Sequence, residues 1–120
     1  MGNPFVHAEL NTTDVEKAKK FYGKLFDWKL EDMPMPEGFT YTMIGVGEGT
    51  GGGMVKQMGA GAPTNWMPYV GVSDIKASTK KARDLGAKVL KDVTEVPDMG
   101  WLSILTDPTG ATIGLWQTKS

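Results

Sequence analysis

Apolar and polar residues alternate at the start of the chain, over residues 4–10. This period of two predicts a half-buried β-strand with one apolar face and one face that carries functional groups. The apolar face consists of Val6, Ala8 and Leu10, and the opposite face of Phe5, His7 and Glu9.

The pattern then changes to a helical period. Thr13 and Glu16 have the spacing of a capping box, and apolar residues recur every three to four positions as far as Leu25. We therefore predict a helix over residues 14–25. Three strands are predicted after it, over residues 28–33, 39–46 and 54–58, because prolines end the first and a glycine-rich turn precedes the last.

The second half of the chain repeats this order. A strand is predicted over residues 66–72, then a helix that begins at Ser73 or Asp74 and ends at Leu85, with Gly86 as a left-handed C-terminal cap. Three strands follow over residues 87–90, 101–106 and 111–117, and the last two are joined by a type I turn at residues 107–110. We predict two modules, about 1–60 and 61–120, within a single domain.

Residues of similar type also recur at an offset of sixty. Thr13-Asp14-Val15 lies over Ser73-Asp74-Ile75, Leu25 over Leu85, Leu30 over Leu90 and Ile44 over Ile104. We interpret this as an internal duplication. The alternative is that two capped helices flanked by strands match by chance in some register.

Composition and charge exclude several classes of protein. The 120 residues contain no cysteine, so disulfides, thiolate metal sites and cysteine nucleophiles are ruled out. Thirteen basic and fourteen acidic residues give a net charge of -1, which offers no electrostatic footprint for nucleic acid. We expect a cytoplasmic protein without a membrane partner, because neither a secretory signal pattern nor a long apolar run is present.

A glycine-rich stretch at residues 47–52 satisfies the dinucleotide pattern G-x-G-x-x-G. That motif binds pyrophosphate only where a helix follows, and here a strand is predicted instead. We interpret the stretch as a flexible hairpin loop.

Several segments occur together in an order known from one superfamily. The first half carries Phe5-Val6-His7-Ala8-Glu9-Leu10, Thr13-Asp14, Phe21-Tyr22 and Trp28; the second half carries Leu85-Gly86-Ala87, Asp107-Pro108-Thr109-Gly110-Ala111 and Leu115-Trp116. Over nearly its whole length the chain resembles the vicinal oxygen chelate superfamily, which includes glyoxalases, bleomycin-resistance proteins and extradiol dioxygenases. The resemblance implies an α+β fold in which two βαβββ modules form a cupped mixed sheet, usually completed in a homodimer, with a ligand or metal on the concave face.

The resemblance also implies where a metal would bind. In metal-using relatives the first, fourth, fifth and last strands each supply one ligand. His7 takes the first of these positions, while Met54, Met67 and Gly114 fall on the others. Glycine has no side chain to offer, and thioether sulfur is too soft for the ions that imidazole and carboxylate bind. We therefore expect neither a metal nor another cofactor.

The residues expected to contact a ligand are mainly aromatic, with a few polar or sulfur-containing groups. They are His7, Glu9, Tyr41, Met54, Met67, Tyr69, Trp101 and Trp116. Such a set predicts a pocket for a small planar or aromatic molecule. The same rings could instead form a hydrophobic core against a partner subunit. Trp28 and Trp66 are expected on the helix-packing side.

His7 has two interpretations, ligand contact or a hydrogen-bonded structural residue, and Glu9 is its nearest expected partner, either for acid–base chemistry or as a surface pair. No residue is assigned a catalytic role. We favour a small-molecule binding protein over an enzyme. The alternatives are a glyoxalase-like lyase or isomerase, a dioxygenase, and a non-catalytic dimerisation module.

Overall fold

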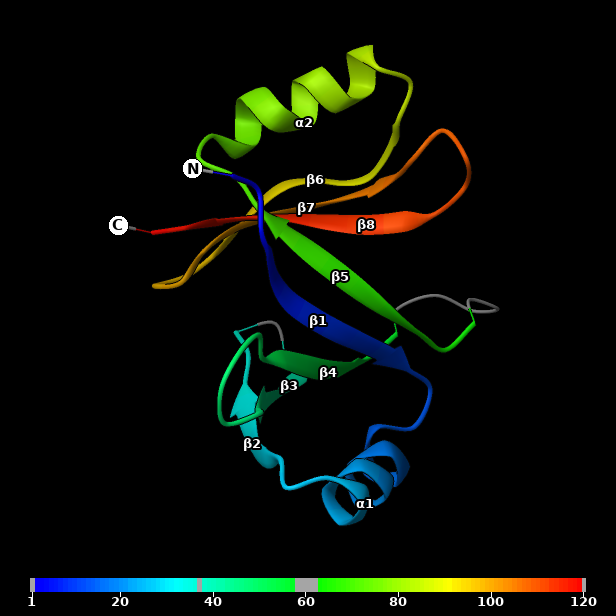
Figure 1. Ribbon diagram of the computed structural model, residues 1–120, viewed down its shortest axis with the longest axis vertical. Coiled ribbons are helices and arrows are strands. Elements are labelled where there is room, and N and C mark those ends of the chain that lie inside the picture. Colours follow the sequence, from blue (N-terminus) through cyan, green and yellow to red (C-terminus); the bar gives the residue numbers. More distant parts are fainter. Residues whose placement is uncertain (1, 37, 58–62, 120) are drawn as a thin grey trace. The chain divides into compact units, whose positions relative to one another are not determined.

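The computed structural model describes residues 2–36, 38–57 and 63–119 (Figure 1). Its elements are β1 (Phe5–Thr12), α1 (Val15–Leu25), β2 (Lys29–Pro34), β3 (Thr40–Gly45), β4 (Gly52–Lys56), β5 (Asn65–Gly71), α2 (Ile75–Asp84), β6 (Lys88–Val96), β7 (Gly100–Thr106) and β8 (Thr112–Thr118). The predicted order of strand, helix and three strands, repeated once, is confirmed. Met58, the predicted end of the fourth strand, lies outside the described residues.

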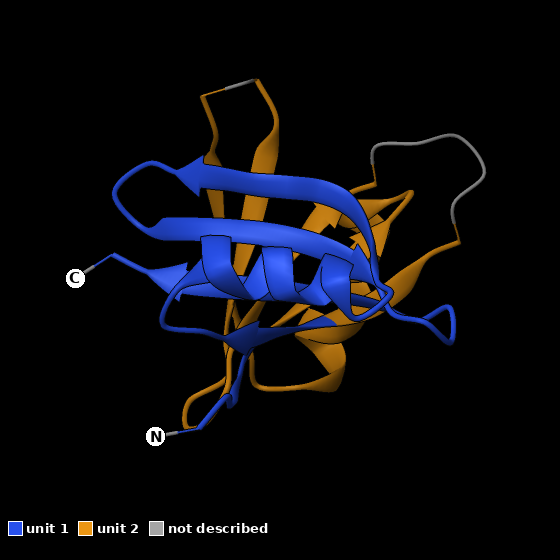
Figure 2. Ribbon diagram, turned by 90° about the horizontal axis from the view of Figure 1, so that it is seen from above, with its two compact units in different colours: residues 1–6, 68–120 blue, residues 7–67 orange. Residues whose placement is uncertain are grey.

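The chain divides into two compact units (Figure 2). Unit 2 comprises residues 7–67, and unit 1 comprises residues 1–6 and 68–120. The amino-terminal residues belong to unit 1 because they pair with the end of β5. The Gly71 N–H donates to the Pro4 carbonyl at 2.8 Å, and the Asn3 side-chain amide donates to the Gly71 carbonyl at 2.9 Å.

The strands of both units follow the same order. In unit 2 the order is β2-β3-β4-β1, in which β1 and β4 are parallel and the other neighbours antiparallel. In unit 1 the order is β6-β7-β8-β5, in which β5 and β8 are parallel. The α+β class with two βαβββ modules is therefore confirmed. The cupped shape, the single domain and the homodimer stay predictions.

Each helix begins at an aspartate. Asp14 Oδ1 accepts a hydrogen bond from the Lys17 N–H at 3.0 Å, and Asp74 Oδ1 accepts one from the Ala77 N–H at 3.1 Å. The prediction of a capping box at Thr13 is wrong, because the carboxylate at position 14 reaches the free N–H groups of the first turn. Within the described ranges, neither helix has the length and apolar character needed to cross a membrane.

Each helix packs on one face of the strands of its own unit. In unit 2, Leu10, Ile44 and Met54 form the buried core, and α1 covers it with side chains that include Val15, Ala18 and Tyr22. In unit 1, Ile75 and Leu105 are buried, and the hydroxyls of Thr79 on α2 and Ser103 on β7 lie 2.9 Å apart. The opposite face of each sheet is therefore available for other purposes.

The offset between the two units is not constant. The N-caps Asp14 and Asp74 are sixty positions apart. The strand pairs Thr42–Met54 and Ser103–Leu115 are equivalent, and each residue of the second pair lies 61 positions after its counterpart in the first. The predicted match of Ile44 with Ile104 is thus wrong, and the counterpart of Ile44 is Leu105. The extra residue is accommodated around β6, whose pairing with β7 contains two register shifts.

Candidate functional site

The sheet of unit 2 has polar groups on the face away from α1. Leu10 pairs with Met54, and both lie in the core beneath the helix. Because successive residues of a strand alternate between faces, the adjacent row of Glu9, Gly53 and Met43 points to the other side. His7 shares that side with Glu9.

Three side chains of this face form a hydrogen-bond chain. The Tyr41 hydroxyl donates to Glu9 Oε1 at 3.0 Å, and His7 Nε2 lies 2.7 Å from the same hydroxyl oxygen. A phenol has one proton, so once it is donated to Glu9 the hydroxyl oxygen can only accept. Nε2 is then the protonated nitrogen of His7. The chain runs from His7 through Tyr41 to Glu9 and connects β1 with β3 across β4.

Gly53 makes this connection sterically feasible. A side chain at position 53 would overlap the ring and hydroxyl of Tyr41. With glycine there, the ring lies directly over β4, and its hydroxyl reaches the residues on β1. Gly53 was not predicted as a site residue, because a run of three glycines gives no alternation from which to read its face.

Burial determines the charge of His7 in this hydrogen-bond chain. Glu9 is only 8% exposed, and His7 and Tyr41 are half-buried. Desolvation lowers the pKa of His7 below its usual value of 6.5, because a buried imidazolium loses hydration. His7 is therefore neutral at pH 7, in agreement with the proton arrangement above.

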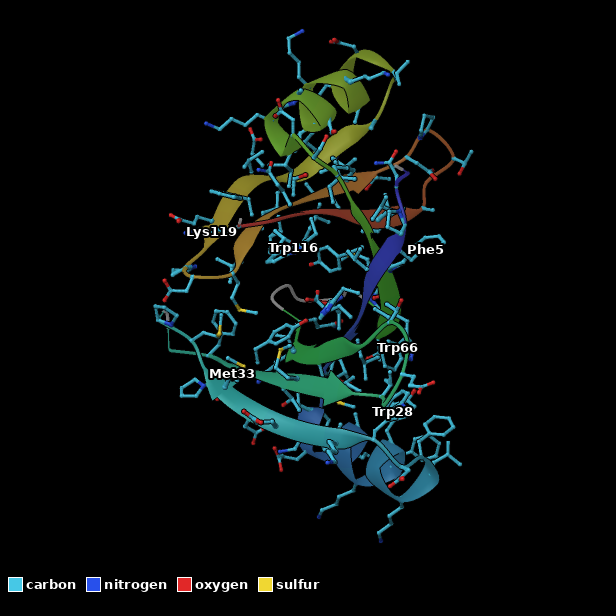
Figure 3. All side chains as sticks on the ribbon, turned by 60° about the vertical axis from the view of Figure 1, so that its left-hand side comes forward. Phe5, Trp28, Met33, Trp66, Trp116 and Lys119 are labelled. Atoms are coloured by element: carbon cyan, nitrogen blue, oxygen red, sulfur yellow. The ribbon has the colours of Figure 1, made fainter. Side chains whose placement is uncertain are left out.

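Two methionines extend the same face with apolar surface. Met33 pairs with Tyr41, and Met43 pairs with Gly53, so both share the side of the hydrogen-bond chain. Both are half-buried, and Met33 is labelled on β2 in Figure 3. Thioethers are polarizable and adapt to aromatic partners. We name the surface formed by His7, Glu9, Tyr41, Met33 and Met43 the polar face of unit 2.

Unit 1 carries aromatic rings on the face away from α2. Tyr69 pairs with Gly114, where a side chain would overlap the Tyr69 ring, and Gly100 similarly leaves room for the ring of Trp116. Tyr69 is 3% exposed and Trp116 is half-buried. The Trp116 Nε1–H donates to Thr118 Oγ1 at 3.0 Å. Met67 precedes Tyr69 by two residues on β5 and is equally buried.

Met54 was expected to contact a ligand on the face that carries His7, and this placement is wrong. Its side chain is fully buried in the core with Leu10 and Ile44, on the α1 side of the sheet. The error follows from the offset: Gly114 corresponds to Gly53 at an offset of 61, whereas an offset of sixty leads to Met54. Gly53 therefore occupies the position on the His7 face.

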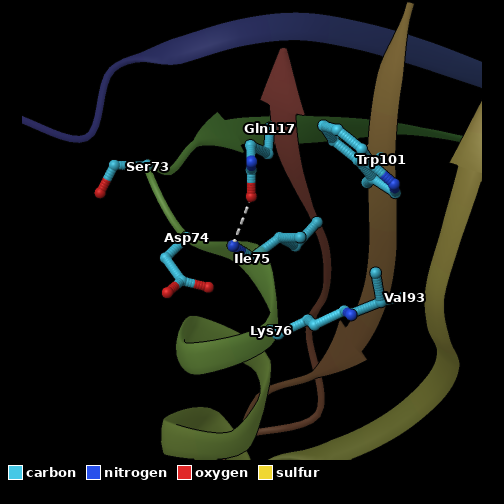
Figure 4. Close-up of a pocket in the computed structure, with 7 residues that line it drawn as sticks. All are labelled: Ser73, Asp74, Ile75, Lys76, Val93, Trp101 and Gln117. Carbon is cyan, nitrogen blue, oxygen red and sulfur yellow. Dashed lines mark hydrogen bonds between the residues drawn. The ribbon is translucent and has the colours of Figure 1, made fainter. Parts of the chain in front are cut away.

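Trp101 was expected on the face of Tyr69, and this placement is also wrong. It pairs with Gln117, whose Oε1 accepts a hydrogen bond from the Ile75 N–H at the start of α2, at 2.8 Å. Trp101 thus lies on the α2 side, where it lines an open pocket of about 410 Å³ with Lys76 and Val93 (Figure 4). The cause is the same offset error. At the observed offset of 61 the counterpart of Tyr41 is Leu102, so Trp101 is one residue out of register and lies on the opposite face.

The remaining two tryptophans lie on the α1 side, as predicted. The Trp66 Nε1–H donates to the Tyr22 hydroxyl at 3.2 Å, and the rings of Tyr22 and Trp28 stack with centroids 5.5 Å apart. Figure 3 shows Trp28 and Trp66 beside α1.

The sequence matches the family model described as Glyoxalase/Bleomycin resistance protein/Dioxygenase superfamily over residues 5–115. The chain belongs to this superfamily. The predicted resemblance to vicinal oxygen chelate proteins is thereby confirmed.

The curated relatives that this chain matches are longer than the chain itself. CFP32 of Mycobacterium tuberculosis, which has the provisional name of a glyoxylase, is 37% identical over 115 residues that cover 92% of this chain and 44% of the relative. The anthracycline biosynthesis protein DnrV of Streptomyces peucetius is 24% identical over 127 residues, covering 91% and 45%. The chain thus spans less than half the length of these relatives.

Solved structures of other proteins share the fold of this chain. The hypothetical protein BH1468 of Bacillus halodurans has a TM-score of 0.75 at 16% identity, and the superposition covers 100% of this chain and 97% of BH1468. Methylmalonyl-CoA epimerase of Mycobacterium tuberculosis has a TM-score of 0.72 at 14% identity, with coverage of 97% and 88%. At these identities the likeness extends to the fold alone.

The residues at the superfamily's implied metal positions do not fit a metal ion. With the register corrected, the four positions hold His7, Gly53, Met67 and Gly114, so only one offers an imidazole or carboxylate. Among the described residues no three His, Asp or Glu side chains gather closely enough to bind a metal. We therefore derive no chemistry through a metal at these positions.

Proposed function

We propose that this superfamily member binds a small planar or aromatic molecule, without a metal ion, on the polar face of unit 2. The observation that carries the proposal is the hydrogen-bond chain of His7, Tyr41 and Glu9 beside two methionine side chains. Polar groups with fixed positions beside aromatic and thioether side chains are typical of small-molecule sites.

Each part of the face has a distinct role in this proposal. The rings of His7 and Tyr41 are nearly parallel, with centroids 6.1 Å apart and an interplanar angle of 25°, so together they offer a flat surface for stacking. Met33 and Met43 supply adaptable apolar contacts. The buried carboxyl group of Glu9 holds the Tyr41 hydroxyl in place, so that the polar group presented to a ligand has a fixed orientation.

Acid–base catalysis is the second candidate, and the pKa of His7 favours it. A neutral imidazole coupled through a phenol to a carboxyl group is able to move a proton at pH 7. One of the curated relatives is named as a glyoxylase. We propose a lyase or isomerase reaction if this chain is an enzyme. A purely structural dimerisation module would show neither binding nor turnover.

Ligand-observed NMR with a panel of soluble phenols, anilines and indoles, which can donate a hydrogen bond to the Tyr41 hydroxyl oxygen, tests the binding proposal. Tyr41→Phe keeps the ring but removes the hydroxyl, and we expect it to weaken binding about tenfold, the effect of one lost hydrogen bond. Tyr22→Phe is the matched control, because Tyr22 lies on the α1 side. Equal binding by wild type and Tyr41→Phe, or no binder in the panel, would count against the proposal.

The same samples in D2O distinguish binding from catalysis. A bound compound that loses a C–H signal by exchange with solvent deuterium is a substrate for proton abstraction, and His7→Gln would abolish that exchange. Elemental analysis of the purified protein tests the metal-free part. One tightly held metal ion per chain, lost in His7→Ala, would contradict it.

A further inference from the structure

The pocket of about 410 Å³ beside Trp101 lies on the α2 side of unit 1 (Figure 4). Its lining residues come from the start of α2 and from strands β6, β7 and β8. Small-molecule sites in proteins have volumes of about 300–1,000 Å³, so this pocket has room for a molecule of one or two rings. The pocket is too large for a simple inorganic ion to fill.

The sheet side of the pocket is apolar. It is lined by Trp101 on β7 and Val93 on β6, together with the buried Ile75 of α2. The Trp101 ring is half-buried, and the ammonium group of Lys119, which is paired with Glu95, lies over it at 5.3 Å from the ring centroid. The ring is therefore held in place, and the part of it that lines the pocket offers a flat surface to a planar group.

The polar groups around this apolar wall are mainly hydrogen-bond donors. Among the described residues, neither the Lys76 ammonium group nor the Trp101 Nε1–H has a hydrogen-bond partner. The side-chain carbonyl of Gln117 accepts the Ile75 N–H at 2.8 Å, which leaves its NH2 group to donate. A ligand that accepts hydrogen bonds would satisfy all three groups.

The carboxylate of Asp74 also lines the pocket, but it already has a structural role. As the N-cap of α2 it accepts the Ala77 N–H, and Figure 4 shows it pointing away from Trp101 and Gln117. The same figure shows the Lys76 side chain extending from α2 toward β6. The charge on Lys76 is thus the one that the described lining residues leave uncompensated on the Trp101 side. This favours an anionic ligand.

Unit 2 shows that the βαβββ module does not need these residues. At the offset of sixty that holds for the helices, Lys76 corresponds to Glu16. At the offset of 61 that holds for the later strands, Trp101 corresponds to Thr40. Both helices nevertheless have the same type of N-cap. The tryptophan ring and the positive charge therefore exceed what the packing of the module requires.

We propose that this pocket binds an aromatic carboxylate of one or two rings. The ligand ring stacks on Trp101 and packs against Val93. Its carboxylate pairs with Lys76 and accepts a hydrogen bond from the Gln117 NH2 group, and such charge-assisted contacts are the stronger kind. This inference goes beyond the proposed function and does not rest on it, because the pocket belongs to unit 1 and the polar face belongs to unit 2.

The indole N–H signals in an NMR spectrum of the intact protein test the site, with 2-naphthoate as the probe. The chain has four tryptophans, and Trp101→Phe identifies the Trp101 signal by its absence. We expect 2-naphthoate to move the Trp101 signal more than the Trp28 signal and to saturate at millimolar concentration or below. A Trp101 signal that stays in place, or that moves no more than that of Trp28, would overturn the proposal.

A charge change tests whether the ligand is bound as an anion. Lys76→Gln should weaken the binding of 2-naphthoate about fivefold and leave that of the neutral 2-naphthamide unchanged, because the amide has no charge for Lys76 to compensate. Lys81→Gln is the matched control, since it removes the same charge from an exposed position of α2 that does not line the pocket. Equal weakening by the two variants, or equal affinity of wild type for the two compounds, would contradict the proposal.

Tyr41→Phe separates this site from the polar face of unit 2. The variant should bind 2-naphthoate like wild type and move the same Trp101 signal, even though it weakens binding at the polar face. If Tyr41→Phe abolishes the response of Trp101, the probe binds at the polar face and the α2-side pocket is not its site. Thermal melting of each variant establishes that it is folded.

Discussion

The first strand of each unit contributes a different kind of side chain to the sheet face opposite the helix. β1 places His7 and Glu9 there in unit 2, whereas β5 places Tyr69 at the position in unit 1 that matches Glu9, sixty residues later. In both units an aromatic ring lies over a glycine on the last strand. In unit 2 the ring of Tyr41 comes from β3, and in unit 1 that of Tyr69 comes from β5.

This difference shows how one frame can carry two kinds of surface. The glycine positions 53 and 114 correspond in register, so each unit has the same space for a ring. When β3 fills the space, the first strand is free to hold polar groups, and the ring's hydroxyl connects them. When the first strand fills the space itself, that face becomes apolar. The two units thus share the packing around this glycine, whereas the side chains on the face opposite the helix differ.

The largest expected effect concerns the cores beneath the two sheets. Met54 is fully buried against α1, whereas its counterpart Leu115 is only half-buried. Met54→Ala should lower the free energy of unfolding by about 3 kcal/mol, because it leaves a cavity in a closed core, and Leu115→Ala by about 1–2 kcal/mol. Urea denaturation measures both. Equal losses would mean that the two cores are equally well packed, and the comparison between the units would fail there.

The two glycines on the last strands should differ next. In Gly114→Ala the new methyl group meets the Tyr69 ring near its attachment point, and Tyr69 is buried, so the ring has little freedom to move. In Gly53→Ala it meets the far end of the half-buried Tyr41 ring, which can swing aside. We expect Gly114→Ala to destabilise the protein by about 2 kcal/mol and Gly53→Ala by about 1 kcal/mol.

A second measurement connects Gly53 to the hydrogen-bond chain. If Tyr41 swings aside in Gly53→Ala, His7 loses its contact with the Tyr41 hydroxyl, and the histidine ring signals in an NMR titration should move. Gly114→Ala should leave them in place. A reversed order of stabilities, or identical His7 signals in wild type and Gly53→Ala, would contradict the role assigned to Gly53.

Most of the fold could be predicted from the sequence because its signals are local. Periods of two and of 3.6 identified the ten elements found among the described residues, and the left-handed cap at Gly86 and the turn ending at Gly110 are confirmed by positive φ angles of 103° and 101°. The predicted strand over residues 87–90 was too short. Lys91 and Asp92 interrupt its apolar pattern, yet β6 continues to Val96 because it pairs with β7.

The site was less predictable because it depends on register between distant strands. His7, Glu9 and Tyr41 were expected on one face, and the structure brings them together. However, Met54 and Trp101 were placed one residue out of register, which moves a side chain to the opposite face of a sheet. The glycine run before Met54 and the register shifts of β6 hide the additional residue, and neither carries an apolar pattern that would reveal it.

The N-caps should show the smallest difference between the units. Asp14 and Asp74 accept nearly identical hydrogen bonds, so Asp14→Ala and Asp74→Ala should each cost about 1 kcal/mol of stability. Thr13→Ala and Ser73→Ala, which alter the preceding residues, are the controls and should have little effect. Asparagine at position 14 or 74 should retain most of the stability. A cost at Thr13 equal to that at Asp14 would revive the capping-box prediction.

Between pH 7 and pH 5 the pH dependence of the unfolding free energy should report on His7 in unit 2, because unit 1 contains no histidine. Burial lowers the pKa of His7, so well above pH 6.5 the imidazole is neutral in both the folded and the unfolded chain and contributes no pH dependence. Below 6.5 the unfolded chain binds the proton first, and the unfolding free energy falls until the pH reaches the pKa of the folded state. The lowered pKa values of Asp32, Asp92 and Asp107 act only at more acidic pH, since these carboxyl groups are ionised in both states above about pH 5.

Urea denaturation of wild type between pH 7 and pH 5 should therefore show a decline in the unfolding free energy, and His7→Gln should remove that decline. If wild type instead gains stability as the pH falls through this window, attraction to Glu9 outweighs burial, and His7 is a cation in the folded protein.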